Sequence, residues 1–392
     1  MSSSTERSDI NNHDNKQDLI IPKLRNNLFK DNWSTKKLGD ISKIIMGQSP
    51  SSSNYSDDTD DTILIQGNQD LNNGLVVPRI YTSEITKISK PGDIILTVRA
   101  PVGDIAINEY DCCIGRGVCS ITPHENKLFI YYYLQYLNNK KIWNKYSQGS
   151  TFESVNSKDI KNLKIKIPSI NEQNYISEFL SSIDKKIEFM EKKYNHYNHF
   201  KKYLLQNFFN DNYSSNGFKK LFGASEFIKL GELASIQTGN KDLKDKKEDG
   251  KYPFFVRSEK IERIDTYSFD GEAILIPGDG KIGEIYHYIN GKFDYHQRVY
   301  KISNFENVMG KYVYYYLEEN FLREAKRNTA KATVDSLRLS TIINMKIKLP
   351  DITVQNKIVD ILSLTDKKIY SLQKGITLNK EFKRSLLSKM FC

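Results

Sequence analysis

Two closely similar stretches, separated by a constant offset, limit what this chain can fold into. The first is KIKIPSINEQNYISEFLSSIDKKI at 164–187, and the second is KIKLPDITVQNKIVDILSLTDKKI at 346–369. Asp184 and Asp366 lie 182 residues apart in these stretches, as do Gln173 and Gln355. A constant offset of this kind indicates that one unit of roughly 180 residues occurs twice.

Each stretch predicts a strand end followed by a long helix. A short apolar run closes at Pro168 or Pro350, and proline cannot donate to a strand ladder. Asn171 and Thr353 are expected to cap the helices. Apolar residues then recur at two positions of a heptad, which predicts a coiled-coil seam over about five heptads. The seam residues, expected to form the helical spacer and its partner-binding region, are Ile176, Leu180, Ile183, Ile187, Met190, Ile358, Leu362, Ile369, Leu372 and Ile376.

The two long helices are expected to pair with each other in antiparallel orientation. Lys201 and Lys383 interrupt the seam at equivalent positions, 182 residues apart. Polar residues at such positions usually fix the register at some loss of stability. The alternative is two independent amphipathic helices, each covering its own domain, although a seam of about five heptads exceeds what one small domain needs.

The order of elements predicts an α+β chain in which two tandem mixed α/β domains, related by a pseudo-twofold axis, are separated by two long antiparallel helices. The expected parts are a polar flexible tail (1–32), a first domain (33–167), a first helix (168–210), a linker (211–226), a second domain (227–349) and a second helix (350–392). Both domains contain short strands and a tyrosine run in a helical context, at 131–133 and 314–316. We expect these tyrosines to pack in the cores.

Composition limits the kinds of binding partner and the cellular compartment that fit this chain. The chain has 58 Lys and Arg against 48 Asp and Glu, a formal net charge of +10, which weakly favours a polyanionic partner. Cys112, Cys113, Cys119 and Cys392 show no metal-ligand spacing, so buried thiols are expected rather than disulfides. The sequence shows no signal peptide and no membrane span, and we expect a cytoplasmic protein.

No motif predicts catalysis or a metal site. The segment 278–283 matches G-x-G-x-x-G, but the alternating residues that follow it predict a strand where a dinucleotide site requires a helix. Asp279 and Lys281 have a nuclease-like spacing without a second acidic residue. We therefore expect a hairpin loop here, and a chain without a cofactor or metal of its own.

These motifs, in this order and duplicated, resemble the specificity subunits of type I restriction–modification enzymes. Each half opens with W/F…KLG(D/E) and ends in KIKIP…EQ…I…FL…ID-K-K-I, and the resemblance covers 33–392. It implies two target recognition domains, a bipartite double-stranded DNA target with an unread spacer, and a host-defence role. It also implies two methylation subunits that bind the helical region and carry S-adenosylmethionine, and restriction subunits that use ATP and Mg²⁺. The tail before Trp33 is longer than the pattern requires.

Two similar domains suit two half-sites on one duplex, with the helices setting the distance between them. Since the domains differ in sequence, the half-sites should differ too. Loops between strands are the favoured contacts, because their side chains can enter a groove. In the first domain these are Gln48, Ser49, Gln66, Asn68, Arg99, Arg116, Gln148, Ser150 and Thr151. In the second they are Asn240, Lys241, Arg257, Ser258, Lys281, His296, Gln297, Arg298, Lys326, Asn328, Lys331 and Thr333.

Other interpretations remain open at this point. Each candidate contact can instead be a solvated loop residue or a structural arginine. The whole chain can be a tandem-domain enzyme acting on nucleic acid, which would need catalytic residues that the sequence does not show. It can also be a coiled-coil scaffold or inhibitor without sequence-specific DNA contact.

Overall fold

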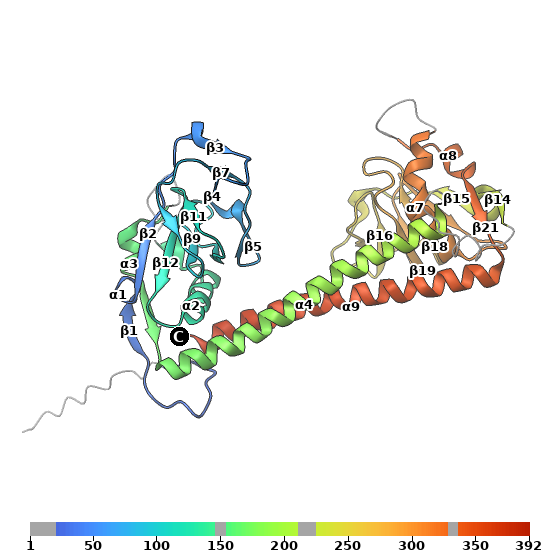
Figure 1. Cartoon of the computed structure of the whole chain (residues 1–392). Coiled ribbons are helices and arrows are strands. Elements are labelled where there is room, and N and C mark those ends of the chain that lie inside the picture. The colour runs from blue at the N-terminus through green and yellow to red at the C-terminus, as the bar shows by residue number, and fades with distance from the viewer. Residues whose placement is uncertain (1–20, 146–153, 211–224, 328–335) are drawn as a thin grey trace, which may run out of the picture. The chain divides into compact units, whose positions relative to one another are not determined.

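The computed structural model describes residues 21–145, 154–210, 225–327 and 336–392. It divides into two units, one made of Met1–Phe189 with Ile376–Cys392 and one made of Met190–Gly375. The two long helices, α4 (Ile170–Phe209) and α9 (Ile352–Met390), each contribute one part to each unit (Figure 1). The predicted long helices are therefore confirmed.

Unit 1 contains two mixed sheets and one small antiparallel pair. The larger sheets have the strand orders β2-β12-β9-β10-β6-β5 and β3-β7-β4-β11-β8, and β1 pairs with β13. The strands are β1 (Ser34–Lys37), β2 (Ser42–Met46), β3 (Tyr55–Ser56), β4 (Thr62–Ile65), β5 (Leu71–Asn72), β6 (Leu75–Val76), β7 (Tyr81–Thr82), β8 (Ile88–Ser89), β9 (Ile94–Thr97), β10 (Ile105–Ile107), β11 (Cys112–Ile114), β12 (Val118–Pro123) and β13 (Lys164–Ile167). The helices are α1 (Leu38–Ile41), α2 (Lys127–Asn139) and α3 (Ser157–Lys161), with the short 3-10 turns Ser52–Asn54, Asn68–Asp70 and Ile142–Lys145.

Unit 2 repeats this plan with fewer strands. Its main sheet has the order β15-β20-β18-β19-β16-β17, and β14 pairs with β21. The strands are β14 (Glu226–Lys229), β15 (Ser235–Thr238), β16 (Tyr252–Phe255), β17 (Glu262–Ile264), β18 (Phe269–Pro277), β19 (His287–Tyr295), β20 (Val299–Ser303) and β21 (Lys346–Leu349). The helices are α6 (Leu230–Leu233), α7 (Gly310–Arg327) and α8 (Leu339–Ile343), with a 3-10 turn at Leu243–Asp245.

The tyrosine runs pack in the cores, as predicted. Tyr132 of α2 and Tyr315 of α7 are among the largest fully buried side chains. Each run also packs against an aromatic residue at the end of a long helix: Phe391 lies 5.4 Å from Tyr133, and Phe209 lies 5.6 Å from Tyr316, between ring centroids. Each core is thus completed by the helix that follows the other domain in the sequence.

Equivalent ion pairs hold the two long helices antiparallel in both units. Lys383 of α9 contacts Asp184 of α4 at 2.6 Å in unit 1, and Lys201 of α4 contacts Asp366 of α9 at 3.0 Å in unit 2. The two lysine side chains are only 14% and 15% exposed. The seam lysines therefore pair with specific carboxylates, as expected of polar residues that fix a register.

Seam residues pack into the domain cores: Ile176, Leu180, Ile183 and Ile187 belong to the core cluster of unit 1, and Ile358 and Leu362 belong to that of unit 2. Most of the ten are buried, and Met190 and Ile369 are half-buried. The surface that another chain could meet is formed by other residues of α4 and α9. The predicted caps are wrong in position: Asn171 and Thr353 lie inside the helices, and Asp351 caps α9 by accepting a hydrogen bond from the Thr353 backbone N–H at 2.8 Å.

Residues 21–32, which the sequence placed in a flexible tail, contact the helices of unit 1. The Arg25 guanidinium donates to both carboxylate oxygens of Glu172 at 2.7 Å, and these side chains are 9% and 2% exposed. The Leu24 backbone N–H donates to the Lys389 carbonyl at 2.8 Å, and the Phe29 ring packs on Tyr175. This segment is therefore anchored by buried charges.

The predictions for the cysteines and for the segment 278–283 agree with the structure. Cys112, Cys113 and Cys119 are buried free thiols and Cys392 is a half-buried one. Burial raises the pKa of Cys119 to about 12, so this thiol is inert. The segment 278–283 is a loop between β18 and β19, without a helix. Among the described residues no helix is long and apolar enough to cross a membrane, and no group of His, Cys, Asp and Glu could hold a metal ion.

Candidate nucleic-acid interface

Four loops of unit 1 meet at one end of its sheets. They follow β2, β4 and β9 and connect β11 to β12. The Gly115 N–H donates to the Ile65 carbonyl at 2.8 Å, and the Val98 N–H donates to the Gly117 carbonyl at 2.9 Å. These bonds join strand ends that are distant in the sequence, so the loops form one surface.

This surface gathers predicted DNA contacts from different parts of unit 1. A pocket of about 160 Å³ is lined by Gln66, Gly67, Asn68, Arg99, Ala100, Arg116 and Gly117. Arg99 and Arg116 are exposed, and the Arg116 backbone N–H donates to Ser49 Oγ at 3.1 Å. Gln48 is exposed in the same loop as Ser49, where its N–H donates to the Ile114 carbonyl at 2.9 Å. Cations and amides at one surface are the groups that contact phosphates and base edges.

Unit 2 builds its loops with the same backbone hydrogen bonds. The His296 N–H donates to the Phe255 carbonyl at 2.9 Å, and the equivalent bond in unit 1 runs from Gly115 to Ile65. Gly278 N–H donates to the Arg298 carbonyl at 2.8 Å, where unit 1 has Val98 and Gly117. The two units thus share one loop scaffold.

The side chains on this scaffold differ between the units. These hydrogen bonds and the strand registers align the two units residue by residue. Arg257, Asp279 and Arg298 of unit 2 correspond, in that order, to Gly67, Arg99 and Gly117 of unit 1. Unit 1 therefore presents one arginine between two glycines, beside a pocket, whereas unit 2 presents one aspartate between two arginines. A shared backbone with different side chains is what two different recognition surfaces require.

Ion pairs organise the loops of unit 2. Asp279 Oδ2 accepts from Arg298 Nη1 at 2.9 Å and from Arg257 Nη1 at 3.2 Å. Gln297 Nε2 donates to Asp242 Oδ2 at 3.1 Å. The sequence interpretation missed Asp279 and Asp242 as members of this surface. The sequence drew attention to Asp279 only through its nuclease-like spacing with Lys281, and nothing drew attention to Asp242. In the structure Asp279 instead pairs with two arginines.

His296 is held neutral beneath these loops. Its side chain is 5% exposed, and its Nδ1 accepts a hydrogen bond from the Arg298 backbone N–H at 2.9 Å. Burial, reinforced by the charge of Arg257, lowers the pKa of His296. A neutral imidazole that supports the backbone of Arg298 positions this loop, so His296 itself is not exposed for DNA contact.

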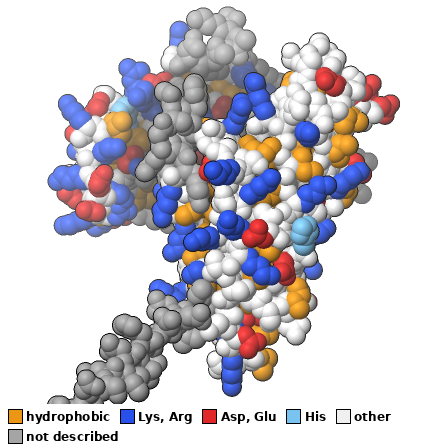
Figure 2. Space-filling view, turned by 90° about the vertical axis from the view of Figure 1, so that its left-hand side faces the viewer, with side chains coloured by type: hydrophobic (Ala, Val, Ile, Leu, Met, Phe, Trp, Pro, Cys, Tyr) orange, Lys and Arg blue, Asp and Glu red, His pale blue; other side chains and the backbone are white. Residues whose placement is uncertain are grey.

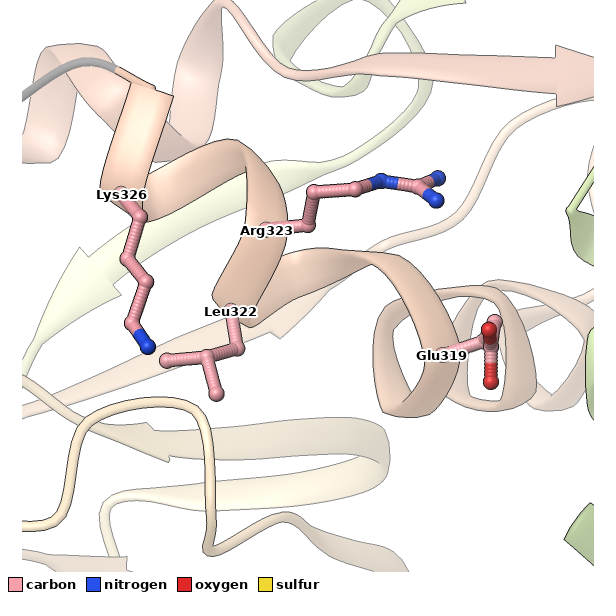
Figure 3. A pocket seen from close by; sticks show the side chains of 4 residues that line it. All are labelled: Glu319, Leu322, Arg323 and Lys326. Atoms are coloured by element: carbon pink, nitrogen blue, oxygen red, sulfur yellow. The ribbon is translucent and has the colours of Figure 1, made fainter.

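The remaining candidates fall into three groups. Asn240, Lys241, Ser258 and Lys281 lie on the loops of the unit 2 surface, where the Gln297 N–H donates to the Lys241 carbonyl at 2.8 Å. Lys326 lies on α7 and lines a separate hollow of about 530 Å³. Its side chain lies beside that of Leu322, and Arg323 points away from both (Figure 3). The positions that lie outside the described residues are Gln148, Ser150, Thr151, Asn328, Lys331 and Thr333.

On the face drawn in Figure 2, positive charge is spread and is not confined to one block. Figure 2 shows Lys and Arg side chains at many places on one face, among uncharged side chains and with some Asp and Glu. The chain as a whole has a formal net charge of +10. Such a surface favours phosphate contacts without specifying a sequence.

Comparison with known proteins identifies the family. The model of the type I restriction modification DNA specificity domain matches twice, at residues 30–198 and 224–380. The chain belongs to this family. The two matches correspond to the two repeated parts of the sequence, so this chain carries two specificity domains.

Individual relatives agree with this family. A Methanocaldococcus jannaschii protein described as the type I restriction enzyme MjaX specificity subunit is 36% identical over 168 residues, which cover 42% of this chain and 39% of that protein. The MjaIX specificity subunit from the same organism is 25% identical, and the match covers 91% of this chain and 92% of that protein. The crystal structure of an S subunit from M. genitalium superposes with a TM-score of 0.68 at 18% identity, covering 95% of this chain and 99% of that one. This last similarity supports the fold.

Proposed function

We propose that this chain is the DNA specificity subunit of a type I restriction–modification complex. Each specificity domain reads one half of a bipartite, asymmetric target in double-stranded DNA, and the chain itself is non-catalytic. One observation carries the proposal: the two units present different polar side chains on loops joined by the same backbone hydrogen bonds. Different side chains on one scaffold give two different half-sites.

The proposed surfaces combine two kinds of contact. Lysine and arginine side chains supply affinity by neutralising phosphates, and this contribution weakens as salt rises. Arginine and amide side chains can form bidentate hydrogen bonds with guanine and adenine in the major groove, which specify the sequence. Gln66, Asn68 and Arg99 offer these groups in unit 1, and Arg257 and Arg298 offer them in unit 2.

The helix pair is the proposed spacer and the docking region for two methylation subunits. Three exposed apolar positions recur at the offset of 182 residues on α4 and α9: Ile170 and Ile352, Phe179 and Ile361, and Phe200 and Phe382. Exposed apolar side chains repeated at equivalent positions suit two copies of one partner. In this assembly the methylation subunits carry S-adenosylmethionine, and restriction subunits use ATP and Mg²⁺. Because the proposed target is DNA, we expect the complex in the cytoplasm.

Single substitutions, one in each unit, test the proposal. Arg99→Ala should weaken or relax recognition of one half-site only, and Arg298→Ala that of the other. The measurement is methylation by the assembled complex of oligonucleotides that vary one half-site at a time. Equal loss at both halves in both variants would reject separate reading. A coiled-coil scaffold without sequence-specific DNA contact would show no half-site preference even in the wild type.

A further inference from the structure

Two arginines and one aspartate of unit 2 form a compact group at the end of its sheet. Arg257 follows β16, Asp279 follows β18 and Arg298 precedes β20, so three different loops supply them. Asp279 accepts from Nη1 of both arginines, at 3.2 Å from Arg257 and at 2.9 Å from Arg298. A single carboxylate thus fixes two guanidinium groups in one place.

The exposure of these side chains shows which member faces outward. Asp279 is 15% exposed, whereas Arg257 and Arg298 are 49% and 63% exposed. The contacts found for both guanidinium groups among the described residues engage Nη1, which leaves Nε and Nη2 as donors. A half-buried acceptor with exposed donors is the arrangement of a pre-organised reading group.

We propose that Asp279 is a positioning residue that holds Arg257 and Arg298 as a pair to read guanine in the half-site of unit 2. This inference rests on the proposed function and names the base class at that site. Arginine donates two parallel hydrogen bonds to O6 and N7 of guanine, and fixing the guanidinium beforehand reduces the entropy lost on binding. Asp279 also offsets one of the two positive charges, which limits attraction to phosphates of any sequence.

Unit 1 lacks this group, so the guanine preference that depends on Asp279 should be confined to one half of the target. Its equivalents are Gly67, Arg99 and Gly117, and the space beside them is a pocket of about 160 Å³. A side chain at Gly117 would meet the Gln66 carbonyl oxygen at 2.0 Å, so arginine cannot be accommodated there without a backbone shift. The two half-sites therefore differ at the base that faces this point.

Selection of bound duplexes from a randomised pool tests the inference. The full chain, assembled with its methylation subunit, is compared as wild type, Asp279→Asn and Asp265→Asn. The control Asp265 forms a similar carboxylate–cation pair in the same unit, 2.7 Å from Lys247. Wild type and the control should enrich guanine at one or two positions of one half-site. Asp279→Asn should lose this preference by about tenfold and keep the other half-site unchanged.

Substitution of the selected guanine by 7-deazaguanine, which lacks the N7 acceptor, provides a second measurement. Wild-type affinity should fall about tenfold, whereas affinity of Asp279→Asn should change little further. An unchanged guanine preference in Asp279→Asn, a selected half-site without guanine, or a loss at both halves would overturn the inference. A rise in affinity for all sequences with no change in base preference would overturn it too, because the arginines would then contact phosphates. Absence of any enriched motif in the wild type would instead reject the proposed function.

Discussion

Replacement of Lys201 and Lys383 by methionine compares the same change at two equivalent positions. Lys383 pairs with Asp184, which also accepts a hydrogen bond from Tyr132 at 2.8 Å. Asp184 is 36% exposed, so water can replace the lost ammonium group. We expect Lys383→Met to lower the free energy of unfolding by about 2 kcal/mol, the contribution of a hydrogen bond to a charged group.

Lys201→Met should destabilise unit 2 more strongly. Lys201 contacts Asp366 at 3.0 Å and also Glu318 at 2.8 Å. Burial raises the pKa of Glu318, while Lys201 opposes that rise. Glu318 is 26% exposed, less than Asp184, so removal of the lysine leaves a half-buried carboxylate without its cation. Loss of one partner of a buried ion pair costs about 3–5 kcal/mol.

The sequence itself offers the control for this difference. Unit 1 has Gln135 at the position equivalent to Glu318. The double variant Lys201→Met with Glu318→Gln should therefore return to a loss close to that of Lys383→Met. Urea unfolding followed by circular dichroism measures both units, and tryptophan fluorescence follows unit 1 alone, because both tryptophans, Trp33 and Trp143, lie there. Equal losses for the two single variants, or no recovery in the double variant, would refute this reasoning.

Three further perturbations test other parts of the structure. Arg25→Ala should release residues 21–32 to limited proteolysis and destabilise unit 1 by about 3 kcal/mol, because Glu172 loses its cation; an unchanged cleavage pattern would count against this anchor. Phe391→Ala and Phe209→Ala should each cost about 3–5 kcal/mol in urea unfolding, since each ring fills one core, and a loss below 1 kcal/mol at either would contradict equivalent roles. Burial lowers the pKa of His296, so its contribution to stability is complete above the unfolded pKa near 6.5 and is lost as pH falls through the lower folded value. His296→Asn should therefore reduce the decrease of melting temperature on acidification, and an unchanged decrease would argue against the neutral imidazole.

Much of the fold follows from the sequence because its signals are periodic. A heptad pattern repeated at a constant offset predicts two long helices, and two lysines at equivalent seam positions predict the register. The structure adds their partners, Asp184 and Asp366, which lie in the duplicated stretches themselves. The tyrosine runs were placed correctly in the cores for the same reason.

The proposed recognition surfaces are only partly predictable. Candidate loops were found because polar residues follow predicted strands, and the pocket lined by Gln66, Asn68, Arg99 and Arg116 brings four of them together. The role of Asp279 could not be predicted, because its partners lie 19 and 22 residues away in separate loops. No local pattern reports such a contact. The anchoring of residues 21–32 was missed for the same reason, since Arg25 and Glu172 are 147 residues apart.

Mapping of the methylated bases in DNA exposed to the assembled complex tests the central claim most directly. If two different readers on one chain recognise the target, the modified positions will define one motif with two unlike halves and a gap of constant length. Methylated bases in a palindromic motif, in a single uninterrupted motif or without any shared sequence would contradict it.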